Sequence, residues 1–470
     1  MSAPRLWVDV DDLFHYLERH DRPSGIQRVT FEICRALHRL DDGAGMLGFL
    51  RRRFSARDLM VVEWSDVETA YAKVADSGGS NPSARLPRPF DLTDRESPEG
   101  RRDLVRAGLD SQWLALQALA RLPIRAGRVA AVAFRGHLEA ARSPTPILPT
   151  HIRETRLLQD VSTPGDVLLA LGSPWVHDDY AQTVRFARDE RRMRFALLIH
   201  DLLPIRHPEW ADLGVLTDFR DWHTAVLRIT DQVFANSRTT AEDVTRFATE
   251  SGIERHNPVQ HLPMGTGFSQ SQASHDDAHD QPHLPAPGTY ALFVSTLEAR
   301  KNHALLFRIW RRLLAERPAD QVPTLVFVGR IGWLVADLVQ QLENASWLHG
   351  KIVHLPTVTD AELVALYRGC RFTLFPSLFE GWGLPVTESL ALGRPCLAAD
   401  RPTLREAGGG LARYLDPDSL DDACRAVREL IDDPAGLEAW SARIAREFRP
   451  VSWDRAAETI LGSVRGLDEG

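Results

Sequence analysis

The fold is decided by the stretch Pro376-Ser377-Leu378-Phe379-Glu380-Gly381-Trp382-Gly383-Leu384-Pro385-Val386-Thr387-Glu388. The apolar run before it, Phe372–Phe375, predicts a short buried strand, and the segment after it, residues 389–392, predicts a helix. The stretch is therefore predicted to be a turn that leads from a strand into a helix.

The chemistry of this turn suits a ligand that carries both phosphate and hydroxyl groups. Gly381 and Gly383 let a ligand approach the backbone closely, and Pro385 is favourable at the first helical position. Free amides at a helix N-terminus bind phosphate or another anion. Glu380 and Glu388 flank the loop with seven residues between them, and a sugar nucleotide fits this combination. The alternative for each carboxylate alone is an ordinary acid, one in a loop and one in a solvated first helical turn.

Here the sequence resembles the retaining glycosyltransferases of family 4, whose Glu-x7-Glu signature lies at this place in a GT-B fold. The resemblance implies that Glu380 contacts the hydroxyls of the donor sugar and that Glu388 holds the ribose. It also implies that the amides of residues 381–383 face the diphosphate. Trp382 and Leu384 belong to the same expected donor site.

Composition limits the classes of function. A chain of 470 residues with 44% hydrophobic content is long enough for two domains. A net charge of −8 without a basic tail gives no electrostatic support for a nucleic-acid partner. No signal peptide or long apolar run is evident, so we expect a cytoplasmic protein. The four cysteines form no CxxC pair, which argues against a zinc site or disulfides: Cys34, Cys370, Cys396 and Cys424.

The resemblance implies an α/β fold of the GT-B type, in which two doubly wound Rossmann-like domains face each other across a cleft. It covers about 350 of the 470 residues. The expected parts are an acceptor-side domain (1–268) with an irregular insertion (77–149), a linker (269–288), a nucleotide-sugar domain (289–450), and a crossover helix with the tail (451–470).

A second glycine turn lies near the N-terminus. Residues 23–29 open a helix after the predicted first strand, so Gly25 again gives an anion-ready helix start. By the resemblance this loop faces the cleft, and Arg28 reaches the donor phosphate or the acceptor; a surface arginine is the alternative. The triplet Asp9-Val10-Asp11 mimics a metal-binding DxD, but it lies in the wrong half of the protein, and we expect neither a metal nor another cofactor.

The near-continuous apolar run of residues 194–204 predicts a buried parallel strand that ends in His200-Asp201. Ligands of open α/β sheets bind beyond the carboxyl ends of the strands, which places His200 for function. The resemblance, through the HDLxP context, implies that His200 points at the donor sugar and the acceptor side. A structural histidine is the alternative.

The insertion contains a basic amphipathic stretch, residues 101–142, with interleaved Trp and Leu. Such a stretch can lie on an anionic membrane surface, which would make the protein peripheral at the inner face of the membrane. It can equally be a helical insertion packed on its domain.

The second half opens with a predicted strand, Tyr290–Val294, that runs toward Arg300 and Lys301. Lysine occurs only three times among the 56 basic residues, so a lysine in a motif is informative. The resemblance makes Arg300 and Lys301 the pair that grips the diphosphate. Many family members carry an arginine five positions before the residue that corresponds to Arg300. This chain has Ser295 there, and Arg28 or Arg330 could replace the missing arginine.

Residues 329–333 form another predicted glycine turn, which includes Gly329 and Arg330. The turn resembles the GxxGW element of the bacterial mannosyltransferase branch of the family. The HDLxP, RKN and GxxGW elements together make GDP-mannose the expected donor. The expected acceptor is a hydroxyl of a glycan or of a polyprenyl-linked oligosaccharide, in the synthesis of a surface polysaccharide.

The implied reaction is transfer of the sugar with retention of anomeric configuration. Arg300, Lys301 and the loop amides would stabilise the charge that grows on the leaving phosphate, without a metal. No residue is an obvious nucleophile, so same-face attack is preferred, with the leaving phosphate accepting the acceptor's proton. A nucleotide-sugar 2-epimerase, a phosphorylase and an inactive sugar-binding scaffold remain as alternatives.

Overall fold

The computed structural model of the protein describes residues 4–18, 20, 22–75, 156–211, 213–266 and 283–467. The predicted insertion and residues 269–282 of the predicted linker lie outside these ranges. Membrane contact by residues 101–142 therefore stays a prediction, as do the domain boundaries. No helix in the described ranges is long and apolar enough to cross a membrane.

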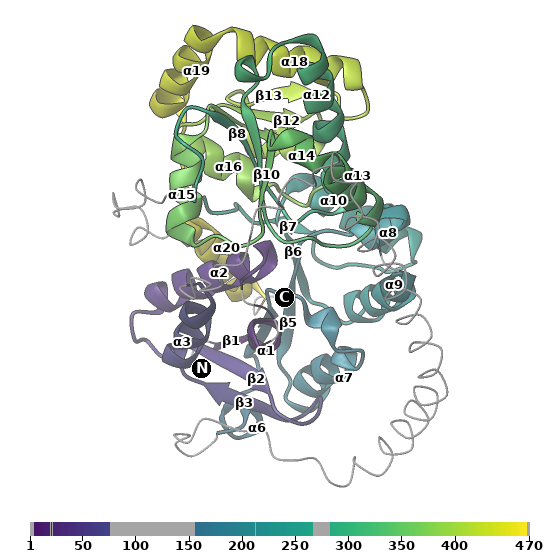
Figure 1. Ribbon diagram of the computed structural model, residues 1–470. Helices are drawn as coiled ribbons and strands as arrows, with labels where there is room; N and C mark the ends of the chain where they lie inside the picture. The colour runs from purple at the N-terminus through teal and green to yellow at the C-terminus, as the bar shows by residue number, and fades with distance from the viewer. Residues whose placement is uncertain are drawn as a thin grey trace, which may run out of the picture. The chain divides into compact units, whose positions relative to one another are not determined.

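The first sheet is built from residues 6–261 (Figure 1), and its strands run in the order β3-β2-β1-β4-β5-β6-β7. Neighbouring strands are parallel except β2 and β3. Val8 of β1 lies opposite Leu169 of β4. The strands are β1 (Leu6–Asp9), β2 (Leu47–Arg52), β3 (Leu59–Val62), β4 (Val167–Ala170), β5 (Arg194–Ile199), β6 (Gln232–Ala235) and β7 (Gln260–His261).

The second sheet is fully parallel and has the order β10-β9-β8-β11-β12-β13. Its strands are β8 (Tyr290–Val294), β9 (Thr324–Val328), β10 (Ile352–Leu355), β11 (Phe372–Phe375), β12 (Cys396–Ala399) and β13 (Arg413–Leu415). In both sheets the chain starts in the middle, winds to one edge and returns to wind to the other. This is the doubly wound order, so the predicted fold class of two parallel α/β sheets is confirmed.

Helices connect the strands of both sheets. In chain order the α-helices are α1 (Asp11–Leu17), α2 (Gly25–Asp41), α3 (Trp64–Ala75), α6 (Leu158–Val161), α7 (Tyr180–Arg185), α8 (Leu203–Arg206), α9 (Leu213–Leu227), α10 (Arg238–Glu250), α12 (His303–Glu316), α13 (Ala336–Asn344), α14 (Ser346–His349), α15 (Asp360–Gly369), α16 (Leu384–Ala391), α17 (Pro402–Gly408), α18 (Leu420–Asp432), α19 (Pro434–Glu447) and α20 (Trp453–Gly466).

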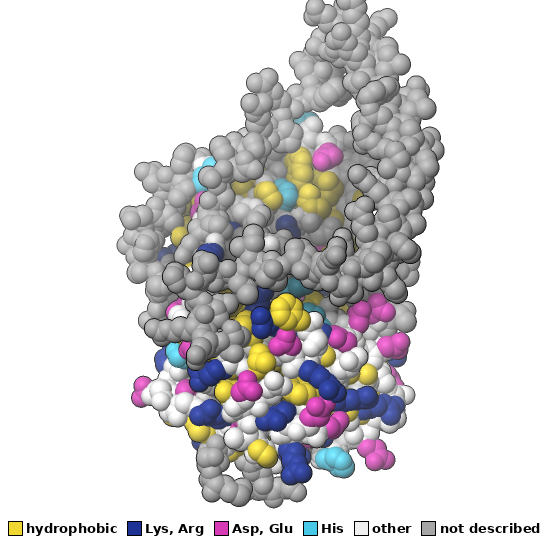
Figure 2. Space-filling model, turned by 90° about the horizontal axis from the view of Figure 1, so that it is seen from below, with side chains coloured by type: hydrophobic (Ala, Val, Ile, Leu, Met, Phe, Trp, Pro, Cys, Tyr) yellow, Lys and Arg dark blue, Asp and Glu magenta, His cyan; other side chains and the backbone are white. Residues whose placement is uncertain are grey.

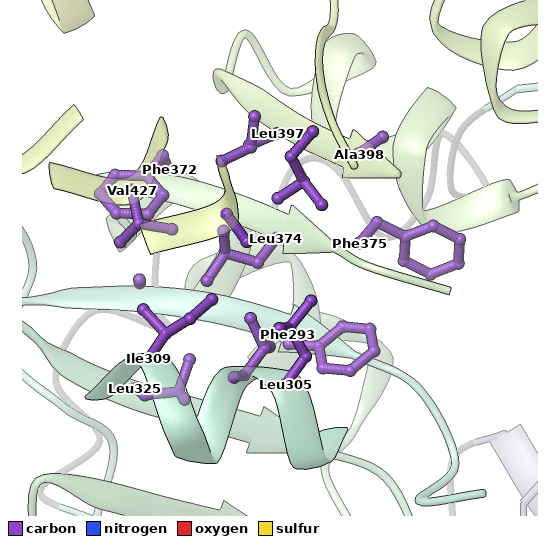
Figure 3. Packing of buried hydrophobic residues seen from close by; sticks show 14 of the residues in the cluster. Phe293, Leu305, Ile309, Leu325, Phe372, Leu374, Phe375, Leu397, Ala398 and Val427 are labelled. Carbon is purple, nitrogen blue, oxygen red and sulfur yellow. The ribbon is translucent and has the colours of Figure 1, made fainter. Parts of the chain in front are cut away.

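Each sheet has its own apolar core. In the second, Phe293 of β8 and Leu374 of β11 pack with Leu305 and Ile309 of α12 (Figure 3). The strands of a parallel sheet are covered on both faces, which is why β8, β9 and β11 are nearly continuous runs of apolar residues. These cores fix the strand ends from which the loops of the candidate site emerge.

The last helix, α20, follows the second sheet in sequence but packs against α2, beside the first sheet (Figure 1). Its buried residues Trp453, Ile460 and Val464 belong to the same apolar cluster as Val29 and Ile33 of α2. The C-terminal segment therefore contributes to the core of the N-terminal sheet.

Figure 2 shows one face of the molecule, on which basic and acidic side chains of the described residues are interspersed. The described part of this face therefore carries no continuous surface of one charge. Nucleic-acid-binding surfaces differ from this face, because they gather basic side chains into a patch or stripe.

Candidate active site

The candidate site lies where the order of the second sheet reverses, between the neighbouring strands β8 and β11. The loop after β8 contains Ser295 and, in the short helix η6 (Ala299–Lys301), the two cations. The loop after β11 is the glycine turn that precedes α16. Doubly wound sheets bind ligands at this crevice, because the loops that leave neighbouring carboxyl ends diverge there.

The structure brings Glu380 together with both predicted cations. Lys301 Nζ lies 2.5 Å from Glu380 Oε1, and Arg300 Nη1 lies 2.9 Å from Glu380 Oε2. Burial raises the pKa of the Glu380 carboxyl, but Lys301 and Arg300 more than offset it and lower the pKa to about 2. Glu380 is therefore an ionised carboxylate held between two positive charges at neutral pH.

A second buried carboxylate, Glu298, completes this cluster and was missed in the sequence analysis. Arg300 Nε donates to Glu298 Oε2 over 3.0 Å, and Arg300 Nη1 also donates to the carbonyl oxygen of Phe379. Burial raises the pKa of Glu298, which Arg300 and Lys301 counteract. Two carboxylates thus face two cations, and the Arg300 guanidinium is oriented by contacts from both loops.

The backbone amides of the glycine turn lie at the start of α16. Gly383 has φ +111° and precedes the first residue of α16, a conformation that favours glycine. Gly381 and Gly383 are buried, yet the amides of residues 381–383 donate to no acceptor in the described part of the chain. Buried amides rarely lack an acceptor, so this turn is suited to receive oxygen atoms of an anionic ligand.

His200 lies against this turn through its backbone. A Cβ on Gly381 would lie 2.0 Å from the His200 carbonyl oxygen, so only glycine fits there. The His200 ring is buried, and its Nε2–H donates to the carbonyl oxygen of Leu171 over 2.7 Å. Burial lowers the pKa of the imidazole, which leaves a neutral ring whose Nδ1 can accept a hydrogen bond.

The N-terminal glycine turn meets the other end of the Glu-x7-Glu motif. Arg28 Nη1 lies 2.8 Å from Glu388 Oε1, and a Cβ on Gly25 would lie 3.9 Å from Leu384 Cδ1. Tyr367, which the sequence analysis missed, donates its hydroxyl to Glu388 Oε2 over 2.9 Å. Gly25, Arg28, Leu384 and Glu388 are therefore neighbours, although they come from distant parts of the sequence.

Of the remaining predicted donor residues, Ser295 and Gly329 lie next to each other. A Cβ on Gly329, at φ +140°, would lie 2.3 Å from the Ser295 carbonyl oxygen. Ser295 Oγ donates to the carbonyl of Thr296 over 2.9 Å. Arg330 is exposed, and its guanidinium lies 6.0 Å from the ring centroid of Tyr16. The structure thus places Arg330 on an aromatic ring of the first lobe, not in the cluster of Arg300 and Lys301.

The two aspartates of the DxD-like triplet have separate partners. Asp9 Oδ2 accepts a hydrogen bond from the Tyr180 hydroxyl over 2.8 Å, and burial raises the Asp9 pKa to about 7. Asp11 Oδ2 lies 2.8 Å from His177 Nε2. These contacts tie the two carboxylates into the first lobe.

Comparison with known proteins identifies relatives. Residues 274–447 match the family of glycosyl transferases group 1. The serotype-specific mannosyltransferase WbdA of Escherichia coli is 29% identical over 274 residues, which span 56% of this chain and 32% of WbdA. The O-antigen chain mannosyltransferase B of Escherichia coli is 29% identical over 178 residues, 38% of this chain and 46% of that protein. The chain thus spans less than half the length of these relatives.

Among solved structures, an alpha,alpha-trehalose-phosphate synthase (UDP-forming) from Burkholderia vietnamiensis superposes with a TM-score of 0.50 at 15% identity. The match covers 66% of this chain and 73% of that one. This likeness concerns the fold alone, and it agrees with the GT-B class predicted from the sequence. The family match contains Arg300, Lys301, Glu380 and Glu388.

Proposed function

We propose that the protein is a retaining glycosyltransferase that moves a sugar from a nucleoside diphosphate to a hydroxyl of a glycan or lipid-linked glycan. The observation that carries the proposal is the cluster of Arg300, Lys301 and Glu380 beside the unpaired amides of residues 381–383. The family match over the same residues and the names of the relatives support transfer in polysaccharide synthesis.

The cluster keeps hydrogen-bond donors for a diphosphate. A lysine ammonium has three N–H donors, and Lys301 uses one of them for Glu380. Together with the loop amides, these donors suit the oxygens of a phosphate whose negative charge grows as the sugar leaves. Preorganised donors that stabilise developing charge supply a large part of catalysis, so Arg300 and Lys301 act mainly on the leaving group.

Retention proceeds by attack on the same face of the sugar. A double-displacement route would need a carboxylate nucleophile beside the anomeric carbon. Glu380 is paired with two cations and has a lowered pKa of about 2, which makes it a poor nucleophile. We assign it instead to the hydroxyls of the sugar, and we assign the acceptor's proton to the leaving phosphate. His200 lies beside the turn and is assigned to the sugar or acceptor side.

The proposed donor is GDP-mannose, which the names of the mannosyltransferase relatives support. We expect the purified protein to release GDP from GDP-mannose when a glycan acceptor is supplied. A panel of nucleotide sugars, followed by chromatography of the released nucleotide, measures this. Release from a different donor would correct the sugar or the base. Conversion of the donor sugar without release would favour an epimerase, and binding without turnover would favour a scaffold.

Metal independence is a separate expected result. Because Arg300, Lys301 and the loop amides provide the positive charge at the leaving group, treatment with a chelator should leave turnover within about twofold of the untreated rate. Turnover is measured without the chelator, with it, and after Mg²⁺ or Mn²⁺ is added back. Strict dependence on an added metal would contradict metal independence and would make Asp9 and Asp11 the candidate metal ligands.

A further inference from the structure

The Glu388 carboxylate is held from two different elements. Arg28 Nη1, on α2, lies 2.8 Å from Oε1, and the Tyr367 hydroxyl, on α15, lies 2.9 Å from Oε2. Glu388 itself is 4% exposed. A buried carboxylate is stable only with such partners, and two partners on different oxygens also fix the rotation of the carboxylate plane.

Within the part of the chain that the structure describes, Arg28 and Tyr367 are the hydrogen-bond partners of the Glu388 carboxylate, and they leave one lone pair on each oxygen. A carboxylate oxygen accepts about two hydrogen bonds, and Arg28 and Tyr367 take one on each side. The two remaining lone pairs belong to the two oxygens of one planar carboxylate. This arrangement suits a ligand with two adjacent hydroxyls. The 2′- and 3′-hydroxyls of a ribonucleoside are such a pair.

We propose that Tyr367 is a positioning residue for the nucleoside of the donor, whose hydroxyl orients Glu388 toward the two ribose hydroxyls. The inference rests on the proposed function, because it takes a nucleoside diphosphate as the donor, with Glu388 as the ribose contact that the family resemblance implies. It adds a specificity role: Tyr367 sets how strongly the site distinguishes a ribonucleotide from a deoxyribonucleotide.

The Tyr367 ring and its hydroxyl have separate roles. The ring is 1% exposed and packs in an apolar cluster with Tyr290, Leu366 and Cys370. Burial and the neighbouring Glu388 raise the pKa of Tyr367 well above its usual value, so its oxygen remains a protonated donor. Phenylalanine at this position would keep the packing of the ring and remove the hydroxyl that donates to Glu388.

The test compares binding of GDP and 2′-deoxy-GDP by calorimetry, or the corresponding uridine pair if the donor screen identifies a uridine donor. The wild type should bind the ribonucleotide about tenfold or more tightly, the scale for one hydrogen bond to a charged group. In Tyr367→Phe this preference should fall several-fold toward one, and in Glu388→Ala it should vanish.

Tyr290→Phe is the matched control. Tyr290 is equally buried in the same cluster, and its hydroxyl donates to the Leu366 carbonyl oxygen over 2.7 Å instead of to Glu388. Its loss should leave the preference at the wild-type value, even if the protein unfolds at a lower temperature.

Two outcomes overturn the inference. If Tyr367→Phe keeps the full preference while Glu388→Ala loses it, then Tyr367 is only a packing residue. If Glu388→Ala keeps the preference, the ribose is bound elsewhere, and Tyr367 does not position the residue that binds it. Failure of the proposed function is distinct, because the wild type would then bind neither nucleotide.

Discussion

Replacing Lys301 by Ala should lower turnover by about 10²-fold or more, the scale for losing one preorganised contact to the charge of the transition state. Lys301 is 2.5 Å from Glu380 and stands beside Arg300 in the loop after β8. Its ammonium places a positive charge at the leaving phosphate. Neither the loop amides nor Arg300 can move to take its place. Steady-state kinetics with saturating donor measure the effect.

Lys351→Ala is the control for loss of a lysine. Lys351 precedes β10, an edge strand of the same sheet, and its Nζ donates to the carbonyl oxygen of Val322 over 2.8 Å. This variant should turn over at the wild-type rate. Equal rates for Lys301→Ala and Lys351→Ala would show that the leaving group is bound elsewhere.

Replacing Glu380 by Gln should reduce kcat by about 10²-fold, with a smaller change in the KM for the donor. The sugar gains positive charge as its bond to phosphate breaks, so a carboxylate at its hydroxyls interacts more strongly in the transition state than in the ground state. Gln keeps the shape of the side chain and removes the charge. Comparison of kcat with KM separates this effect from simple loss of binding.

The control for this substitution is Glu316→Gln on α12, a carboxylate that pairs with Arg312 at the surface. This substitution should leave kcat and the KM for the donor unchanged, since an exposed ion pair contributes little to stability. A Glu380→Gln enzyme with normal kcat would remove Glu380 from the chemistry and leave it as a partner of Arg300 and Lys301.

The sequence predicted the parts of the site that follow from local pattern. Apolar runs predicted β8 and β11, and glycine turns with a following helix predicted the amides at Gly381 and Gly383. Arg300 and Glu380 are 80 positions apart, and they can meet because the parallel strands β8 and β11 are neighbours whose carboxyl ends lie at the same edge of the sheet. The resemblance to the glycosyltransferases of family 4 added the expected roles of these residues.

Other contacts could not be predicted because they depend on tertiary geometry. Tyr367 lies in the last turn of α15, where its apolar ring has the spacing of a core residue and gives no sign of a hydrogen bond to Glu388. Glu298 is an ordinary loop acid in sequence until burial pairs it with Arg300.

Glu406 makes another contact between distant parts of the sequence. Its carboxylate, on α17, accepts hydrogen bonds from the backbone amides of Arg238 and Thr239, 168 and 167 positions away, at the start of α10. A carboxylate at a helix N-terminus is favourable, but spacing along the chain cannot indicate which acid arrives there. The irregular insertion lies outside the described residues, so its role remains a prediction.

The central claim is that one donor is held by two separate sets of charges, with Arg300 and Lys301 on the diphosphate and Glu380 on the sugar. Calorimetric titration of GDP, which lacks the sugar, into the wild type, Lys301→Ala and Glu380→Gln tests this most directly. We predict binding about tenfold or more weaker in Lys301→Ala. Binding should be unchanged or tighter in Glu380→Gln, because loss of this carboxylate releases both cations for the diphosphate. Weaker binding in Glu380→Gln with normal binding in Lys301→Ala would contradict the account.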